Sequence, residues 1–128
     1  MRIPPGFNTV APYFIVDGAE AFVDFLVVGL GGVEVLRHVD GGRIANAQVR
    51  LGDSTVMASE SAERYPAMPG SYYLYVENAD AAMTMAIAAG ATSIMAVADM
   101  PYGDRQGGVK DAWGNLWWIS ERLVDGPY

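Results

Sequence analysis

The chain has 128 residues, of which 52% are hydrophobic and 18% are charged, as is typical of a folded globular protein rather than a disordered one. It contains no cysteine, which excludes disulfides, thiolate nucleophiles and cysteine–zinc sites. Its net charge of -7 repels phosphate backbones, so we expect no nucleic-acid partner. No apolar run is long enough to cross a membrane and no secretory signal is visible, so we expect a cytoplasmic protein without membrane contact.

The first sixty residues predict a strand, a helix and three further strands. Residues 1–8 contain two prolines and a glycine and are expected to form an irregular arm. Asp17 with Glu20 forms a capping-box pattern at the start of the helix. The predicted elements are a strand at 9–16, a helix at 17–29 and strands at 33–39, 43–51 and 55–59.

The second half repeats this order after a linker at 60–70 that contains two prolines and a glycine. Asn78 is the expected helix cap, and residues 111–115 carry the composition of a tight turn. The predicted elements are strands at 71–76 and 92–97, a helix at 79–89, and two strands on either side of the turn. VDGAEA at 16–21 lies sixty positions before VENADA at 76–81, which indicates an internal duplication.

These elements predict an α+β fold made of two βαβββ modules, at residues 9–60 and 70–122, within one domain spanning 1–128. The helix faces place Phe25 and Met85 at equivalent positions sixty residues apart, so both are expected to be buried. Two curved mixed sheets of this kind are expected to enclose a cavity. Strand alternation places Trp117 against a helix and Trp118 on the cavity side.

Several segments are similar to one known family. The chain resembles the vicinal oxygen chelate superfamily, also called the glyoxalase/bleomycin-resistance/dioxygenase family, and within it the PhnB-like branch. The resemblance runs from about residue 10 to residue 121, and Ala112 stands where the family turn usually has proline. The matching segments are Pro12-Tyr13, AFVDFL at 21–26, GRIANAQVRLGDSTVMAS at 42–59, PYGDR at 101–105 and DAWGNLWW at 111–118.

The resemblance also locates the positions where related enzymes hold a divalent metal. Those enzymes use four side chains, mostly His and Glu, on the first and last strands of the two halves. The matching positions here are Ala11, Met57, Ser71 and Trp118, none of which suits Zn, Ni, Fe or Mn. Asn46 and Gln48 stand where the branch often has His and Glu. We therefore expect neither a metal nor another cofactor.

Other groups offer weaker chemistry. His38, the only histidine, has no evident partner and is expected to be an ordinary edge residue. Glu60 and Glu121 follow strands that line the expected cavity, where a buried carboxylate pair would suit acid–base catalysis, but solvated strand ends are favoured. Asp104 and Arg105 lie in the YGDR loop, where bracing of the loop is favoured over ligand contact.

The remaining pattern favours a cavity with aromatic and amide groups, suited to an organic ligand. Simple filling of the core by these aromatics is an equal alternative. We predict a metal-free small-molecule-binding protein, sequestering an aromatic or cationic compound like the drug-sequestering members of the family, and the resemblance implies a homodimer. The alternatives are a metal-dependent isomerase, lyase or dioxygenase with a non-standard site around His38, Glu60, Asp104 or Glu121, and a structural partner without a ligand. The expected ligand-binding residues are Tyr13, Asn46, Gln48, Met57, Ser71, Tyr73, Tyr102, Arg105 and Trp118.

Overall fold

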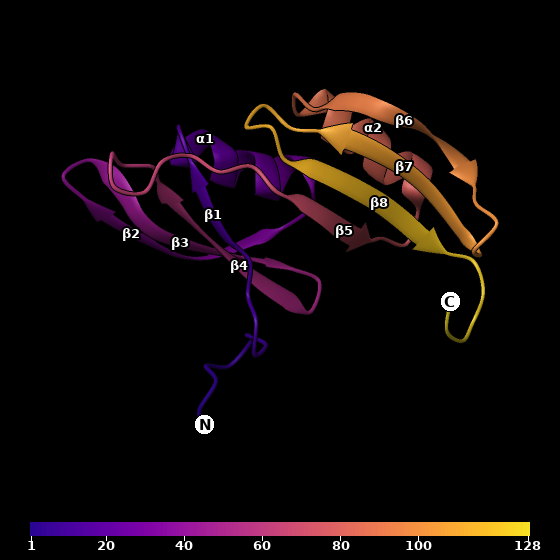
Figure 1. Cartoon of the computed structure of the whole chain (residues 1–128), viewed down its shortest axis with the longest axis horizontal. Coiled ribbons are helices and arrows are strands. Elements are labelled where there is room, and N and C mark those ends of the chain that lie inside the picture. The colour runs from indigo at the N-terminus through magenta and orange to yellow at the C-terminus, as the bar shows by residue number, and fades with distance from the viewer. The chain divides into compact units, whose positions relative to one another are not determined.

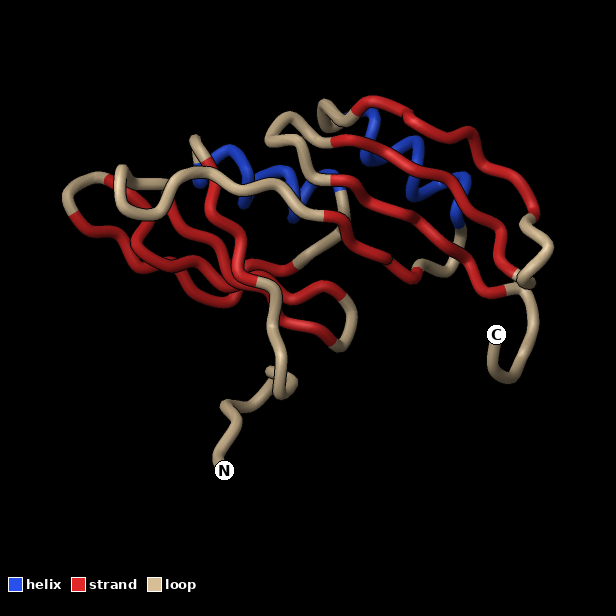
Figure 2. The backbone as a smooth tube through the Cα atoms, viewed as in Figure 1, coloured by secondary structure: helices blue, strands red, loops and turns tan.

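A computed structural model describes all residues from 1 to 128. The chain divides into two compact units, Met1–Pro69 and Gly70–Tyr128, and each unit holds one four-stranded mixed sheet with helical structure on one side (Figures 1 and 2). The predicted α+β fold of two βαβββ modules is therefore confirmed. Neither helical segment has the length and hydropathy of a membrane span.

The first unit has the strand order β1-β4-β3-β2, with β1 parallel to β4 and the other neighbours antiparallel. The first strand begins at Tyr13, later than predicted, and the helix continues from its α-helical part into a π-helical turn. The elements are β1 (Tyr13–Val16), α1 (Ala19–Asp24), η1 (Phe25–Gly29), β2 (Val33–Asp40), β3 (Arg43–Leu51) and β4 (Ser54–Glu60).

The second unit repeats this topology with the order β5-β8-β7-β6, in which β5 and β8 are the parallel pair. Its helix is regular, without a π-helical turn. The elements are β5 (Ser71–Tyr75), α2 (Ala79–Ala88), β6 (Thr92–Asp99), β7 (Asp104–Lys110) and β8 (Leu116–Arg122).

Each unit buries apolar side chains between its helix and one face of its sheet. In the first unit the rings of Phe14 and Phe22 lie 4.9 Å apart and both are fully buried. In the second unit Trp117 and Ile119 are buried on β8. A Cβ atom at Gly107 would lie 2.9 Å from the sulfur of Met83 on α2, so this glycine allows the helix to approach the sheet closely.

The predicted turn before β8 is confirmed, and a buried carboxylate organises it. The Asp111 side chain accepts hydrogen bonds at 2.9 Å from the backbone N–H groups of Trp113 and Asn115 and from the Trp117 indole N–H. Gly114 adopts a φ of 87°, which glycine tolerates best. Asp111 therefore links the Trp117 indole to the turn that precedes β8.

The helix caps differ between the two modules. Asn78 caps α2 as predicted, because its side chain accepts a hydrogen bond from the Ala81 N–H at 2.9 Å. The predicted capping box at Asp17 is wrong: Gly18, with a φ of 89°, precedes α1 and no side chain at this N-cap makes a cap bond. The Asp17 carboxylate instead accepts a hydrogen bond from the Ser61 hydroxyl, a partner 44 residues away that local spacing does not reveal.

The predicted burial of the Phe25–Met85 pair is half wrong. Phe25 is buried, but Met85 is 41% exposed. The cause is local: Phe25 begins the π-helical turn, which changes the angular spacing of side chains, whereas α2 remains regular. The regular helix turns Met83 and Ala86 to the sheet instead. Val23 and Met83 are one of the equivalent pairs, sixty residues apart, that are buried in both modules.

Candidate functional site

Each sheet has one face against its helix and a second face, which we call the open face. Strand alternation separates the two neighbouring tryptophans as predicted: Trp117 is buried with the helix, and Trp118 is half-buried on the opposite face. The first open face carries Tyr13, Gln48 and Met57, and the second carries Ser71, Tyr73 and Trp118. The candidate site is described separately for these two faces.

On the first open face, three of the expected ligand-binding residues lie side by side. Tyr13 pairs with Met57 across β1 and β4, and Met57 pairs with Gln48 across β4 and β3. Asn46 is two residues from Gln48 on β3 and therefore leaves the same face. All four side chains are at least partly accessible to solvent, with Tyr13 50% exposed.

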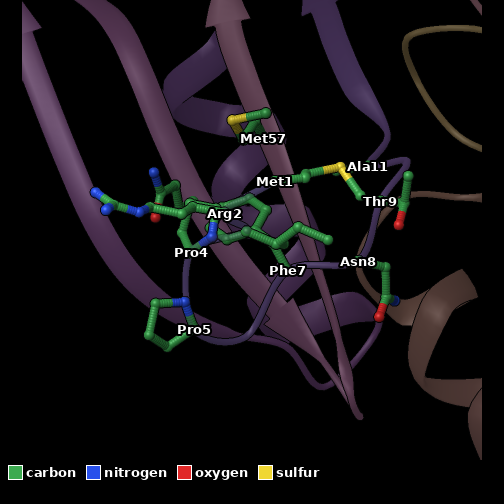
Figure 3. Close-up of a pocket in the computed structure, with 11 residues that line it drawn as sticks. Met1, Arg2, Pro4, Pro5, Phe7, Asn8, Thr9, Ala11 and Met57 are labelled. Atoms are coloured by element: carbon green, nitrogen blue, oxygen red, sulfur yellow. The ribbon is translucent and has the colours of Figure 1, made fainter.

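The N-terminal arm covers part of this face and forms a pocket of about 600 Å³ with it (Figure 3). Ala11, Gln48 and Met57 line the pocket from the sheet side. The Thr55 hydroxyl donates a hydrogen bond of 2.6 Å to the Gly6 carbonyl, which fixes the arm to the sheet. The arm contributes the remaining lining residues: Met1, Arg2, Ile3, Pro4, Pro5, Phe7, Asn8 and Thr9.

On the second open face, aromatic rings lie beside polar groups. Tyr73 pairs with Trp118 across β5 and β8, and the Trp118 indole N–H donates to the Ser71 hydroxyl at 2.9 Å. A Cβ atom at Gly108 would lie 2.9 Å from the Trp118 ring, so the glycine lets this ring lie against β7. Tyr73 is 46% exposed, and its ring lies 5.2 Å from that of Tyr75.

Asp104, at the start of β7, is a fully buried carboxylate on the same face. Its Oδ2 accepts hydrogen bonds from the hydroxyls of Ser120 at 2.7 Å, Tyr128 at 2.6 Å and Tyr73 at 3.2 Å. Its Oδ1 accepts one from the Arg122 guanidinium at 2.9 Å. Burial alone would raise the pKa of the Asp104 carboxyl, but these hydrogen bonds outweigh it and lower that pKa to about 2.

Gln106, two residues further along β7, has a hydrogen-bonded amide oxygen and an unpaired amide nitrogen. The Tyr102 hydroxyl donates to its Oε1. Its Nε2 is buried and has no hydrogen-bond partner, which is uncommon because burying an unpaired donor costs free energy. Gln106 pairs with Ser120 across β7 and β8, so the unpaired amide lies beside the Asp104 cluster.

The structure separates Arg105 from the other expected ligand-binding residues. Strand alternation directs it away from Asp104 and Gln106, and its guanidinium forms ion pairs with Asp80 on α2 at 2.8 Å and Asp99 on β6 at 2.9 Å. The hydrogen bond to Asp80 is the main cause of the raised pKa of Arg105, followed by that to Asp99. Asp104, its neighbour in sequence, lies at the centre of the polar cluster instead.

The two glutamates considered for acid–base chemistry occupy equivalent positions at helix starts. Glu60 accepts hydrogen bonds at 2.9 Å from the backbone N–H groups of Gly18 and Ala19. Glu121 accepts one at 2.9 Å from Ala79. His38 is exposed on the edge strand β2. No three His, Asp or Glu side chains are grouped closely enough to hold one metal ion.

Sequence reasoning missed three residues of the polar cluster: Gln106, Arg122 and Tyr128. Alternation along β7 would have placed Gln106 on the same face as Asp104 and provided a signal for it. Tyr128 lies in residues 123–128, which carry no periodic pattern, so the sequence offered no signal for it. Ser120 and Arg122 share the strand parity of Trp118 on β8, which provided a signal for both.

Comparisons with known proteins agree with this geometry. The model of the Glyoxalase/Bleomycin resistance protein/Dioxygenase superfamily matches residues 6–119. An uncharacterized protein of Mycobacterium bovis, Mb0911c, is 30% identical over 125 residues, covering 88% of this chain and 82% of its own. TioX from Micromonospora sp. ML1 has a similar structure, with a TM-score of 0.73 and 26% identity over 90% of this chain and 99% of that one.

A second similar structure is TnmS3 from Streptomyces sp. CB03234, described as an antibiotic binding protein. Its TM-score is 0.69 and its identity is 18%, over 90% of this chain and 97% of that one. At this identity the likeness shows the fold alone. A PhnB protein is also among the solved structures with this fold.

Proposed function

Because the chain belongs to the Glyoxalase/Bleomycin resistance protein/Dioxygenase superfamily, we propose that it is a metal-free small-molecule-binding protein that takes an aromatic or cationic compound on its open faces. The observation that carries the proposal is the second open face, where the half-exposed rings of Tyr73 and Trp118 lie next to polar side chains. Rigid aromatic side chains with a polar neighbour provide stacking area at low entropic cost. The net charge of -7 favours a cationic ligand over an anionic one.

Three features support binding without a metal. Three of the four positions matched to metal ligands carry side chains without a basic nitrogen or carboxylate, and the fourth is Ala11. Ser71 and Trp118 are hydrogen-bonded to each other, so the Ser71 hydroxyl is already engaged by the indole N–H. Glu60 and Glu121 are the carboxylates nearest in sequence to Met57 and Trp118, and both accept hydrogen bonds from backbone N–H groups at helix starts.

The first open face provides a second recognition surface. Gln48 presents an amide and Met57 a polarizable thioether to the 600 Å³ pocket beneath the N-terminal arm. Neutral hydrogen-bond groups beside apolar surface suit a polyfunctional organic molecule. TnmS3, whose description is an antibiotic binding protein, is an example of this fold in that role.

We further propose that the protein is a cytoplasmic homodimer. The edge strand β2 supports pairing, since all eight of its residues are exposed, including Val33, Val35 and Leu36. A long exposed edge strand with apolar side chains is usually covered in the functional assembly. Sedimentation velocity should give the mass of a dimer for the parent chain and of a monomer for Leu36→Lys. A monomeric parent at micromolar concentration would contradict pairing.

The binding function is tested with a thermal-shift screen of aromatic and cationic compounds, since a ligand that binds only the folded state raises its unfolding temperature. Hits are then titrated by calorimetry into the parent, Trp118→Ala and Tyr65→Ala. Tyr65 is an exposed tyrosine in the loop between β4 and β5 and serves as the matched control. We expect Trp118→Ala to lose affinity and Tyr65→Ala to keep it. Near-stoichiometric Zn, Ni, Mn or Fe in protein purified without a tag or chelator would support the metal-dependent enzyme instead.

A further inference from the structure

Tyr128 is held at the second open face by groups that recognise a phenol. Its hydroxyl donates to the buried Asp104 Oδ2 at 2.6 Å and lies 2.7 Å from the Tyr75 hydroxyl. The Arg122 guanidinium lies 4.2 Å from the centre of its ring, and the Tyr102 ring meets it edge-on at 6.2 Å. An acceptor for the hydroxyl, a cation over the ring and an aromatic wall are together a complete set of phenol contacts.

The segment that carries Tyr128 is attached by few contacts. All residues from 123 to 128 are exposed, and the Tyr128 ring itself is 67% exposed. Besides the hydroxyl of Tyr128, the segment is held by the Leu123 N–H, which donates to Gly103, and by Arg122, which donates to the carbonyls of Gly126 and Pro127 at 3.1 and 3.2 Å. A segment with no buried apolar side chain opens at low free-energy cost.

The Asp104 carboxylate remains hydrogen-bonded when Tyr128 moves away. Without Tyr128, Asp104 still accepts hydrogen bonds from Ser120, Tyr73 and Arg122. Even with Tyr128 in place, the buried Nε2 of Gln106 has no hydrogen-bond acceptor. Asp104 and Gln106 leave the same face of β7, so a molecule entering beside Asp104 reaches a free donor as well as a carboxylate.

We propose that Asp104, Gln106 and the tyrosines around them form a binding site for hydroxyaryl compounds, and that Tyr128 occupies it as an intramolecular substitute for the ligand. The inference rests on the proposed function, because it names the ligand class for the second open face. The ligand hydroxyl replaces that of Tyr128 as donor to Asp104, and a further oxygen on the ligand accepts from Gln106 Nε2. Tyr128 therefore competes with the ligand and lowers its apparent affinity by the fraction of time that the site is covered.

The test uses p-cresol, which reproduces the tyrosine side chain, and toluene, which lacks the hydroxyl. Binding is measured by titration against amide shifts in nuclear magnetic resonance spectra of the parent, Tyr128→Ala and Tyr65→Ala. We expect Tyr128→Ala to bind p-cresol about tenfold more tightly than the parent, with the largest shifts at Asp104 and Gln106. Toluene should gain less from Tyr128→Ala than p-cresol does, because it lacks the hydroxyl that bonds to Asp104, and Tyr65→Ala should match the parent.

Two further variants test the polar contacts. In the Tyr128→Ala background, Gln106→Met should leave the p-cresol affinity within about twofold but reduce the extra affinity that catechol gains from its second oxygen. Asp104→Asn should abolish the preference for p-cresol over toluene. If Asp104→Asn does not fold, Ser120→Ala removes a competing donor from the same carboxylate and is expected to strengthen p-cresol binding.

Equal p-cresol affinity in the parent and in Tyr128→Ala, or equal affinities for p-cresol and toluene, would overturn the inference. If a compound from the screen still binds and depends on Trp118 in that case, the proposed function stands and only the hydroxyaryl site fails. If neither p-cresol nor any screened compound binds, both fail. Lower stability of Tyr128→Ala without any p-cresol binding would show that the cluster only braces the fold.

Discussion

At the residue scale, Asp104 shows how surroundings decide the role of a carboxylate. It is completely buried, yet hydrogen bonds from hydroxyls and a guanidinium keep its pKa at about 2, below the value of about 3.9 for an exposed aspartate. Its neighbour Arg105 faces the other side of the sheet and pairs with Asp80 and Asp99. Adjacent residues of one motif therefore serve different faces, and only Asp104 belongs to the candidate site.

The lowered pKa of Asp104 makes stability depend on pH in a defined range. Because the folded pKa lies below the unfolded one, the contribution is fully present above about pH 4 and is lost as the pH falls towards 2. We expect the urea midpoint of the parent to fall over this range, and that of Asp104→Asn to fall less. The measurement is urea unfolding followed by tryptophan fluorescence at several pH values. An equal fall in both proteins would show that other carboxylates dominate.

The two tryptophans provide a second residue-scale test. Trp117 is 2% exposed and bonded to Asp111, so Trp117→Ala should lower the free energy of unfolding by about 3–5 kcal/mol. Trp118 is half-buried on the open face, so Trp118→Ala should act mainly on ligand affinity. Denaturant unfolding and calorimetry with a screened ligand separate the two effects. If Trp117→Ala loses binding and keeps its stability, the roles of the two faces are reversed.

At the element scale, the two modules share a topology but differ in their helices. The π-helical turn after α1 has no counterpart in α2, and this difference explains why Met85 is exposed although the equivalent Phe25 is buried. Glu60, the last residue of β4, and Glu121, the penultimate residue of β8, are a shared feature, since each accepts a backbone N–H hydrogen bond at the start of its module's helix. A negative charge near a helix N-terminus is stabilised by the helix dipole.

The two methionines of α2 form a matched pair for testing this description. Met83 is 5% exposed and packs against Gly107. Met83→Ala should lower the free energy of unfolding by about 2–5 kcal/mol. Met85 is exposed, and Met85→Ala should change that free energy by less than about 0.5 kcal/mol. Both values come from urea unfolding of the purified variants. Similar costs for the two substitutions would mean that the helix is rotated from its described face.

At the scale of the whole molecule, periodicity and duplication were enough to predict the fold. Strand alternation assigned Trp117 and Trp118 to opposite faces, and the family resemblance is confirmed by the model that matches residues 6–119. The cap of α1 was not predictable, because Asp17 and Glu60 find their partners more than 40 residues away. Tyr128 was missed for the same reason, since its contact with Asp104 depends on how a segment without pattern folds back.

The expected cavity, the single domain at 1–128 and the homodimer remain predictions. Each depends on how units or copies of the chain are arranged, which alternation and turn signals within a segment do not encode. The expected ligand-binding residues Tyr13, Asn46, Gln48 and Met57 lie together on the first open face. Ser71, Tyr73 and Trp118 lie together on the second. Their role in binding is the central claim to be tested.

The most direct measurement is a calorimetric titration with an aromatic compound found in the thermal-shift screen. The compound is titrated into parent protein whose metal content has been measured and into Trp118→Ala, with Tyr65→Ala as control. The proposed function predicts that metal-free parent protein binds the compound, that Tyr65→Ala binds equally well, and that Trp118→Ala binds at least about tenfold more weakly while unfolding at the same urea concentration. Binding that appears only after a divalent metal is added, or that is unchanged in Trp118→Ala, would contradict it.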